Sequence, residues 1–344
     1  MRRERLIRMI EKPNITDEEI ISALWKNYLV PAARVKFLPV GNDSSAWAYR
    51  VDSEDGSSYF LKIRKGISDQ SGLLVPRFLE ENGIQQVIAP LETKEKGLWV
   101  DVDSCCLILY PFVAGREAME IGMSDSQWRE LGSVLKRIHA IELTADISTR
   151  VRHETFVPKW LAPAQELHDQ IKSCEYEDPF QRKLAEFWRE KYSEIQVLME
   201  RAEALGQRVR NARLEFVLCH GDIHTANILI SDEQKMFIVD WDDTVIAPKE
   251  RDLMFVVRGI SGDAIGKKEE EYFFKGYGQT QLDILALAYY RYEWCVQEIG
   301  DYGQRVFLMT DAGDQTRKDS VAGFMDLFTP RNVVEAAFNT QVEI

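Results

Sequence analysis

The stretch VLCHGDIHTANILISDEQKMFIVDWDD, residues 217–243, alternates short apolar runs with polar loops. The apolar runs at 217–218, 228–230 and 236–239 predict three short strands, and residues 231–234 form the turn between the last two. The polar side chains gather where these strands end. We therefore expect Asp222, Asn227 and Asp240 to serve one site.

Residues 220–227 read His-Gly-Asp-Ile-His-Thr-Ala-Asn, and Asp240 closes the hairpin that follows. In phosphoryl transfer, one carboxylate of such a set takes the proton of the acceptor, while an amide and a second carboxylate hold magnesium. We assign Asp222 as the catalytic carboxylate and Asn227 and Asp240 as the metal ligands. The alternative is a buried polar turn capped by aspartates, which the fixed spacing of several polar residues disfavours.

Two departures separate this stretch from protein kinases: Gly221 stands where they have arginine, and Trp241-Asp242 follows Asp240 where they have Phe-Gly. The stretch resembles the aminoglycoside phosphotransferase family, whose members carry H-G-D-x-H-x-x-N and an I-D-W-[DE] segment. Residues 246–255, IAPKERDLMF, are most similar to the branch of that family that phosphorylates spectinomycin. The resemblance implies a bilobal α+β fold of the protein-kinase type, with a small antiparallel-sheet N-terminal lobe (1–113) and a larger, mainly helical C-terminal lobe (114–344).

Length and composition are consistent with that fold. The 344 residues suffice for two lobes, and 45% hydrophobic and 29% charged residues are ordinary for a globular protein. No apolar run approaches the ~20 residues of a membrane helix, and the basic start lacks the apolar core of a secretion signal. Five cysteines without a C-x-x-C motif favour reduced thiols and a cytoplasmic location. A net charge of −13 disfavours nucleic acid as a partner and favours a cationic small molecule, although solubility alone could account for it.

The N-terminal third predicts a helix over 15–29, in which Thr16 and Glu19 form a capping box, and then strands over 34–40, 46–52 and 59–64. Alternation places Lys62 on the face opposite Leu61 and Ile63, so the pattern alone does not bury the lysine. The residues 69–82 predict a helix that ends at Gly83, and 87–91 and 98–103 predict two further strands.

The family resemblance assigns the nucleotide site. It implies that Lys62 holds the α- and β-phosphates, and that the turn 40–45, with Ser44 and Ser45, covers them. The segment 105–115 leads out of the sheet and ends in Pro and Gly, as a hinge would. There the Tyr110 carbonyl and the N–H of Phe112 or Val113 would bind the base of ATP or GTP. Protein kinases pair the lysine with a glutamate on the following helix. Residues 70–79 contain none, so the acidic partner of Lys62 stays open.

The C-terminal part changes to helical periodicity, with a second capping box at Ser124 and Gln127 and a long charged helical stretch over 178–211. We interpret His139 as a core or surface histidine. We expect Asp252 to brace the catalytic loop through backbone N–H groups. A helix from 281 to about 300 carries Glu293 and Glu298, with Asp301 just after it.

The resemblance implies that acids of this region bind the amines of the acceptor. The acids we assign to the acceptor site are Asp242, Glu293 and Asp301. His220 and His224 are assigned supporting roles, with His224 either contacting the phosphate or bracing the loop. The predicted activity is transfer of the γ-phosphoryl group of Mg²⁺-bound ATP to a hydroxyl of an aminocyclitol such as spectinomycin. A metabolic kinase of choline, an amino alcohol or a sugar is the first alternative. A nucleotide-binding protein without catalysis is the second, and the sequence leaves the oligomeric state open.

Overall fold

The computed structural model describes residues 13, 15–38, 46–67, 69–257, 265–309, 313–340 and 342. The predicted phosphate-covering turn, with Ser44 and Ser45, lies outside the described residues. The chain forms two compact units, each built from separate stretches of sequence. The first unit comprises Met1–Ile121, Leu143–Arg152 and Thr225–Thr244, and the second comprises Gly122–Glu142, His153–His224 and Val245–Ile344.

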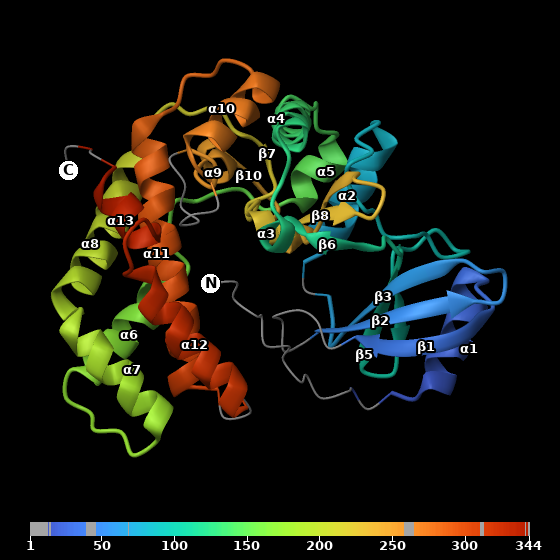
Figure 1. The fold of residues 1–344 in the computed structure, drawn as a ribbon, viewed down its shortest axis with the longest axis horizontal. Coiled ribbons are helices and arrows are strands. Elements are labelled where there is room, and N and C mark those ends of the chain that lie inside the picture. Colours follow the sequence, from blue (N-terminus) through green and yellow to red (C-terminus); the bar gives the residue numbers. More distant parts are fainter. Residues whose placement is uncertain are drawn as a thin grey trace. The chain divides into compact units, whose positions relative to one another are not determined.

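A five-stranded antiparallel sheet in the order β1-β2-β3-β5-β4 forms the body of the first unit (Figure 1). Its strands are β1 (Ala32–Leu38), β2 (Ala46–Ser53), β3 (Ser58–Arg64), β4 (Val100–Val102) and β5 (Cys105–Pro111). The three N-terminal strands and the strand near residue 100 are confirmed. The segment that leads out of the sheet is itself a strand up to Pro111, and it is one of the inner strands.

The predicted strand over 87–91 is wrong. Only Val87 makes an isolated bridge, to Ile238. Pro90 has no N–H to donate to a ladder, and the Leu91 N–H makes a single backbone bond to the Leu109 carbonyl. The apolar character of this stretch reflects burial of Val87 and Ala89 rather than sheet pairing.

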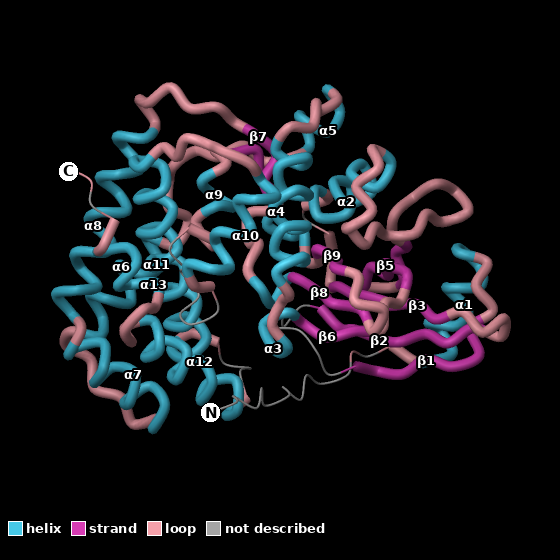
Figure 2. The backbone as a smooth tube through the Cα atoms, turned by 45° about the horizontal axis from the view of Figure 1, so that its top comes forward, coloured by secondary structure: helices cyan, strands magenta, loops and turns pink. Residues whose placement is uncertain are grey.

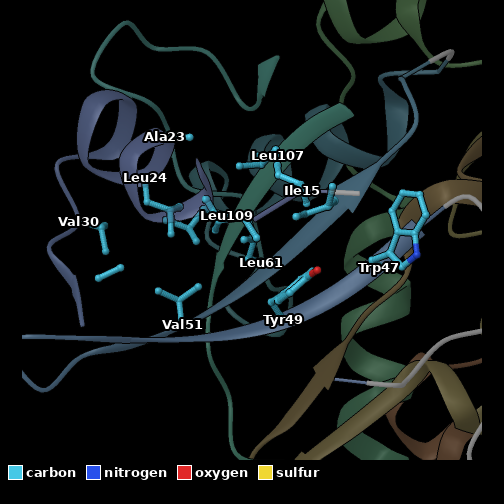
Figure 3. Packing of buried hydrophobic residues seen from close by; sticks show 13 residues of the cluster. Ile15, Ala23, Leu24, Val30, Trp47, Tyr49, Val51, Leu61, Leu107 and Leu109 are labelled. Carbon is cyan, nitrogen blue, oxygen red and sulfur yellow. The ribbon is translucent and has the colours of Figure 1, made fainter. Parts of the chain in front are cut away.

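Helix α1 (Asp17–Tyr28) covers one face of the sheet. The Thr16–Glu19 capping box is present, with the Thr16 N–H donating to Glu19 Oε2 at 2.7 Å. Ile20 and Leu24 of the helix pack against Leu61 and other strand residues (Figure 3). This core takes the buried half of each alternating strand, because side chains of a strand point to the two faces in turn.

Helix α2 (Ser71–Glu81) follows β3 and runs through Pro76. Its Leu73 packs with Ile108 of β5, which is paired in the ladder with Lys62. Helix α2 therefore packs on the face of the sheet that carries Lys62. Leu61 and Ile63 belong to the core on the other face, as the predicted alternation required.

Residues 217–243 contribute to both units. Strands β8 (Ile228–Ser231) and β9 (Met236–Ile238) form the predicted hairpin, and β6 (Gly115–Glu117) pairs with β8 in the first unit. The hairpin is flanked by the 3₁₀ turns η1 (Thr225–Asn227) and η2 (Trp241–Asp243). Strand β7 (Val217–Cys219) pairs with β10 (Val245–Ala247) in the second unit. Two short helices, α3 (Ala118–Ile121) and α5 (Ala145–Arg150), complete the first unit.

The second unit is mainly helical, as predicted (Figures 1 and 2). Its helices are α4 (Asp125–His139), α6 (Leu161–Ile171), α7 (Pro179–Glu190), α8 (Tyr192–Val209), α9 (Glu250–Leu253), α10 (Lys267–Tyr277), α11 (Ile284–Phe307), α12 (Asp314–Leu327) and α13 (Val333–Phe338). The long charged stretch becomes two helices, α7 and α8, that meet at Lys191. Helix α4 packs on α10, while α11 contacts α6, α8, α12 and α13.

Helix α11 extends beyond its predicted end near residue 300. Gly300 and Gly303 let neighbouring side chains approach the helix rather than end it. A Cβ at Gly300 would lie 2.8 Å from the Trp160 ring, and one at Gly303 would lie 2.8 Å from Leu167. Asp301 is therefore a residue of the helix and not of the segment after it.

Two further observations bear on the sequence analysis. All five cysteines are free thiols. Among the described residues, no helix combines the length and the apolarity that crossing a membrane requires.

Candidate active site

Asn227 and Asp240 lie at the same end of the β8–β9 hairpin, in the first unit. Ile228 pairs with Ile238, and the Val239 N–H donates to the Asn227 carbonyl at 2.9 Å. Asp240 has a left-handed backbone (φ 64°), which strands and helices do not use and which is uncommon for non-glycine residues. Its side chain is 55% exposed, while Asn227 is buried. The hairpin register therefore brings the amide and the carboxylate to one edge.

Lys62 points from β3 toward the turn after this hairpin. Its Nζ lies 3.0 Å from Asp242 Oδ2 and 3.9 Å from Asp240 Oδ1. Arg64, two residues further along β3, contacts the same Asp242 oxygen at 3.1 Å. Burial raises the pKa of Asp242, but the charges of Lys62 and Arg64 outweigh it and hold that pKa below its usual range. Asp242, which we assigned to the acceptor site, is thus ion-paired with both cations of β3.

The predicted base-binding segment lies at the end of β5. Tyr110 pairs with Phe60 in the ladder, and the Phe112 N–H donates to the Ser58 carbonyl at 3.3 Å. Since that N–H already extends the sheet, Val113 becomes the better of the two candidate donors to a base. The Arg50 guanidinium lies 4.6 Å from the centre of the Phe112 ring.

In the second unit, Asp252 holds the start of the catalytic loop. Its two carboxylate oxygens accept the N–H groups of His220 at 2.9 Å and Gly221 at 2.8 Å. The predicted bracing role of Asp252 is confirmed. Gly221 has a φ of 86°, a conformation that an L side chain would strain.

Asp252 is itself fully buried and supported by His139. The His139 Nε2 lies 3.0 Å from Asp252 Oδ2, and its Nδ1 lies 2.7 Å from the Tyr277 hydroxyl. Burial alone would raise the pKa of Asp252. The contacts with His139 and with the backbone N–H groups lower this pKa by more than burial raises it, so the carboxylate stays ionised. Burial also raises the pKa of the neighbouring Cys219 thiol. A protonated thiol and a histidine with both nitrogens engaged are poor metal ligands, so His139 is a core histidine, as predicted.

The Asp222 side chain is 20% exposed and lies between two histidines. The Asp222 N–H donates to His220 Nδ1 at 3.2 Å, and His224 Nε2 lies 3.4 Å from Asp222 Oδ2. Burial raises the pKa of Asp222, but the contact with His224 and the charges of His220 and Arg251 outweigh it. The carboxylate is therefore favoured in its ionised form, the form that accepts a proton.

The acids of α11 differ in their partners. Glu293 pairs with Arg251 at 2.9 Å, and both side chains are nearly buried, at 12% and 7% exposed. Asp301 accepts from Arg305 Nε at 3.0 Å, one helical turn away. Burial raises the pKa of Glu298 to about 7, and the negative charges of Asp301 and Asp222 add to the shift.

Comparisons with known proteins agree with this geometry. Residues 36–291 match the "Phosphotransferase enzyme family", a range that includes β3, the catalytic loop, the hairpin and the first part of α11. This chain belongs to that family. No curated protein sequence gives a significant match.

Among solved structures, this phosphotransferase is similar to spectinomycin phosphotransferase in complex with ADP and spectinomycin. The two chains share 33% sequence identity with a TM-score of 0.88, over 95% of this chain and 99% of the other. Two more distant structures share the fold. An amicoumacin kinase bound to AMP-PNP and Ca²⁺ is 18% identical over 92% and 95% of the chains, with a TM-score of 0.61. A choline kinase from Streptococcus pneumoniae is 16% identical over 90% and 99%, with a TM-score of 0.56.

The hairpin edge of this phosphotransferase suits a hard divalent cation. An amide oxygen and an exposed carboxylate on one edge are oxygen donors of the kind that Mg²⁺ takes in nucleotide sites, where it keeps waters and phosphate oxygens as its other ligands. The strained backbone of Asp240 is explained if it aims that carboxylate at such an ion.

Arg64 and Glu298 were not assigned a role from the sequence. Arg64 was visible as the next residue on the Lys62 face of β3, but nothing in the strand pattern gave it a partner. Glu298 was named on its helix without a role. Its spacing of three residues from Asp301 puts both on one side of α11, which could have grouped them.

Proposed function

We propose that this phosphotransferase is a kinase that transfers the γ-phosphoryl group of ATP, or of GTP, to a hydroxyl of a cationic aminocyclitol such as spectinomycin. The observation that carries the proposal is the Asp222 carboxylate beside His224, on a loop that Asp252 holds by two backbone N–H groups, in a chain of the phosphotransferase family. The 33% identity with spectinomycin phosphotransferase over 95% of this chain supports the choice of substrate.

The proposed reaction gives each side chain a separate task. Lys62 holds phosphate oxygens, and Asn227 and Asp240 hold Mg²⁺, which when bound neutralises charge on the transferring group. The acceptor oxygen forms a bond to the γ-phosphorus while the bond from phosphorus to the β–γ bridging oxygen breaks, and ADP leaves. Asp222 takes the hydroxyl proton and chiefly orients the acceptor, because phosphoryl transfer with a loose transition state asks little of a base.

The chemistry of the α11 acids favours an amine that carries N–H groups. The Glu298 carboxylate can accept hydrogen bonds from a protonated amine, whereas both oxygens of Asp301 are already paired with Arg305. A quaternary ammonium has no N–H and is usually bound by aromatic faces. The rings of Tyr290 and Trp294 are each already stacked with the Arg251 guanidinium, at 5.7 and 5.6 Å. An aminocyclitol is therefore a better fit than choline.

A kinase of choline, another amino alcohol or a sugar is the competing proposal, favoured only by the shared fold with a choline kinase. A screen for acceptor-dependent ADP release separates the two. The purified protein is incubated with MgATP and, in turn, spectinomycin, other aminoglycosides, choline, ethanolamine and neutral sugars. We expect release with spectinomycin, and release with choline alone would overturn the proposal.

The same assay tests the catalytic carboxylate. Asp222→Asn should lower kcat by about 10²–10⁴-fold, the usual contribution of a positioned general base. The melting temperature and the affinity for MgADP should stay near those of the wild type, because Asn keeps the side-chain shape. Wild-type turnover in this variant would exclude the proton-accepting role, and the absence of MgADP binding in the wild type would exclude any kinase.

A further inference from the structure

Two positive side chains of β3 converge on one oxygen atom. Lys62 Nζ and Arg64 Nη1 approach Asp242 Oδ2 at 3.0 and 3.1 Å, and each cation side chain is only 22% exposed. Both residues lie on the same face of β3 because they are two positions apart. The structure thus presents a pair of partly desolvated cations whose head groups share one anionic oxygen.

The side-chain charges around Asp242 do not balance once Asp240 holds a metal ion. Lys62 and Arg64 carry two positive charges, and Asp240 and Asp242 carry two negative ones. The Asp240 carboxylate, 3.9 Å from Lys62, is our proposed metal ligand. When it is committed to the metal, Asp242 alone faces two cations, and one net positive charge remains for a second anionic group.

Helix α2 adds to the positive character of the same spot. A Cβ at Gly72, the second residue of α2, would lie 2.7 Å from Asp242 Oδ1 and 3.2 Å from the Trp241 carbonyl oxygen. Asp242 thus lies against the first turn of an 11-residue helix, whose N-terminal end attracts anions. No side chain at position 72 other than hydrogen leaves room for this approach.

The two acids near the end of α2 are paired within the helix itself. Glu80 and Glu81 are held by Arg77, at 2.9 and 3.0 Å. The helix that supplies a glutamate to the lysine in protein kinases instead brings its N-terminus to Asp242. The acidic partner of Lys62 is therefore Asp242 and not a residue of α2.

The position of Arg64 along β3 fits a nucleotide contact. Arg64 pairs with Ala46, the first described residue after the turn that we expect to cover the phosphates, while Lys62 pairs with Ala48. Arg64 therefore lies closer along the strand to that turn than Lys62 does.

We propose that Arg64 is a second phosphate-binding residue, which together with Lys62 engages the phosphates beyond the first of a nucleoside di- or triphosphate. Asp242 contacts both cations and keeps them in place. This inference rests on the proposed kinase function.

Calorimetric titration with MgADP and with adenosine tests the inference without any acceptor. Arg64→Met should weaken MgADP binding about tenfold, the effect of losing one charge-assisted contact, and leave adenosine binding within about twofold. Arg64→Lys should retain most of the affinity, because it keeps the charge. Arg77→Met, on α2, is the matched control and should bind MgADP like the wild type.

A double variant separates direct contact from simple charge balance. If Arg64 only neutralises Asp242, then Arg64→Met combined with Asp242→Asn should restore wild-type affinity for MgADP. If Arg64 binds phosphate, the double variant should remain about tenfold weaker than Asp242→Asn alone. Restored affinity, or an unchanged affinity in Arg64→Met, would overturn the inference. A wild-type protein that binds no MgADP would instead overturn the kinase proposal itself.

Discussion

Asp252 accepts the backbone N–H groups of His220 and Gly221 and contacts the His139 ring, all without exposure to solvent. Three partners compensate one buried carboxylate, which is the condition under which burial of a charge is tolerated. Asp252 therefore fixes the backbone at the start of the loop that carries Asp222.

Glu298 differs from Asp252, because burial and nearby negative charges disfavour its ionised form. Burial raises its pKa to about 7, with Asp301 and Asp222 adding to the shift, while Arg305 and His224 lower it. The Tyr302 hydroxyl lies against it. A carboxyl whose pKa is higher in the folded than in the unfolded protein binds more protons when folded, so its contribution to stability falls as pH rises.

We expect ionisation of Glu298 to lower the free energy of unfolding. The loss should appear between pH 4.5 and about 7 and be complete above pH 7. Glu298→Gln removes the titrating group, so its free energy of unfolding relative to the wild type should rise with pH. The gain at pH 8 should be on the order of 3 kcal/mol at most, and it should be small at pH 5. Denaturant unfolding at both pH values measures the difference. Glu203→Gln, at an exposed position of α8, is the control and should show no such trend.

At the level of residues, sequence spacing can group candidate residues only where they are close together in the chain. Asp222, Asn227 and Asp240 follow from one stretch, because loop and hairpin spacing are local properties. The link between Lys62 and Asp242 spans 180 residues and could not be derived from spacing. The pairing of Glu293 with Arg251 was missed for the same reason, since it joins α11 to α9.

Helices α4 and α10 pack unusually closely through two glycines. A Cβ at Gly132 of α4 would overlap the Phe273 carbonyl oxygen, and one at Gly276 of α10 would overlap the Arg129 carbonyl oxygen. The backbones of the two helices thus touch on both sides. This contact positions His139 and Tyr277, the last residues of the two helices, against each other.

Gly132→Ala should therefore destabilise the protein. Helix propensity alone would favour alanine by roughly 0.5–1 kcal/mol, but overpacking costs typically about 1–3 kcal/mol and should prevail. Chemical denaturation should show a lower free energy of unfolding. Gly97→Ala is the control, because this exposed loop position has room for a Cβ, which would approach no atom closer than 3.4 Å, and stability should change by no more than about 0.5 kcal/mol. Equal stabilities for the two variants would contradict the account of the helix contact.

At the level of elements, strands and helices with clear periodicity and caps were predicted well. The capping boxes at Thr16 and Ser124 are both present, because a cap is a local arrangement of four residues. The errors came where tertiary contacts override local preference. Residues 87–91 are apolar but unpaired, and α11 continues past Gly300 because Trp160 packs against that glycine.

The whole molecule carries a net charge of −13, and we expect this charge to attract a cationic acceptor. Raising the ionic strength from about 10 mM to about 100 mM shortens the Debye length from about 30 Å to about 10 Å. The kcat/KM for the acceptor, measured at saturating MgATP, should then fall by about three- to tenfold. The kcat at saturating acceptor should change little, because screening acts on the encounter. A kcat/KM that does not respond to salt would mean that the charge serves solubility only.

Both units are assembled from pieces of chain that are far apart in sequence. The first unit takes its sheet from the N-terminal part and the β8–β9 hairpin from residues 225–244. On a ribosome that adds about 5–20 residues per second, the 180 residues between Lys62 and Asp242 take roughly 10–40 s to make. The last strand of the sheet, β5, ends at residue 111, so every strand has been synthesised well before the carboxylate that holds Lys62 and Arg64. Assembly of the phosphate-facing edge is therefore a late event in the life of each new chain.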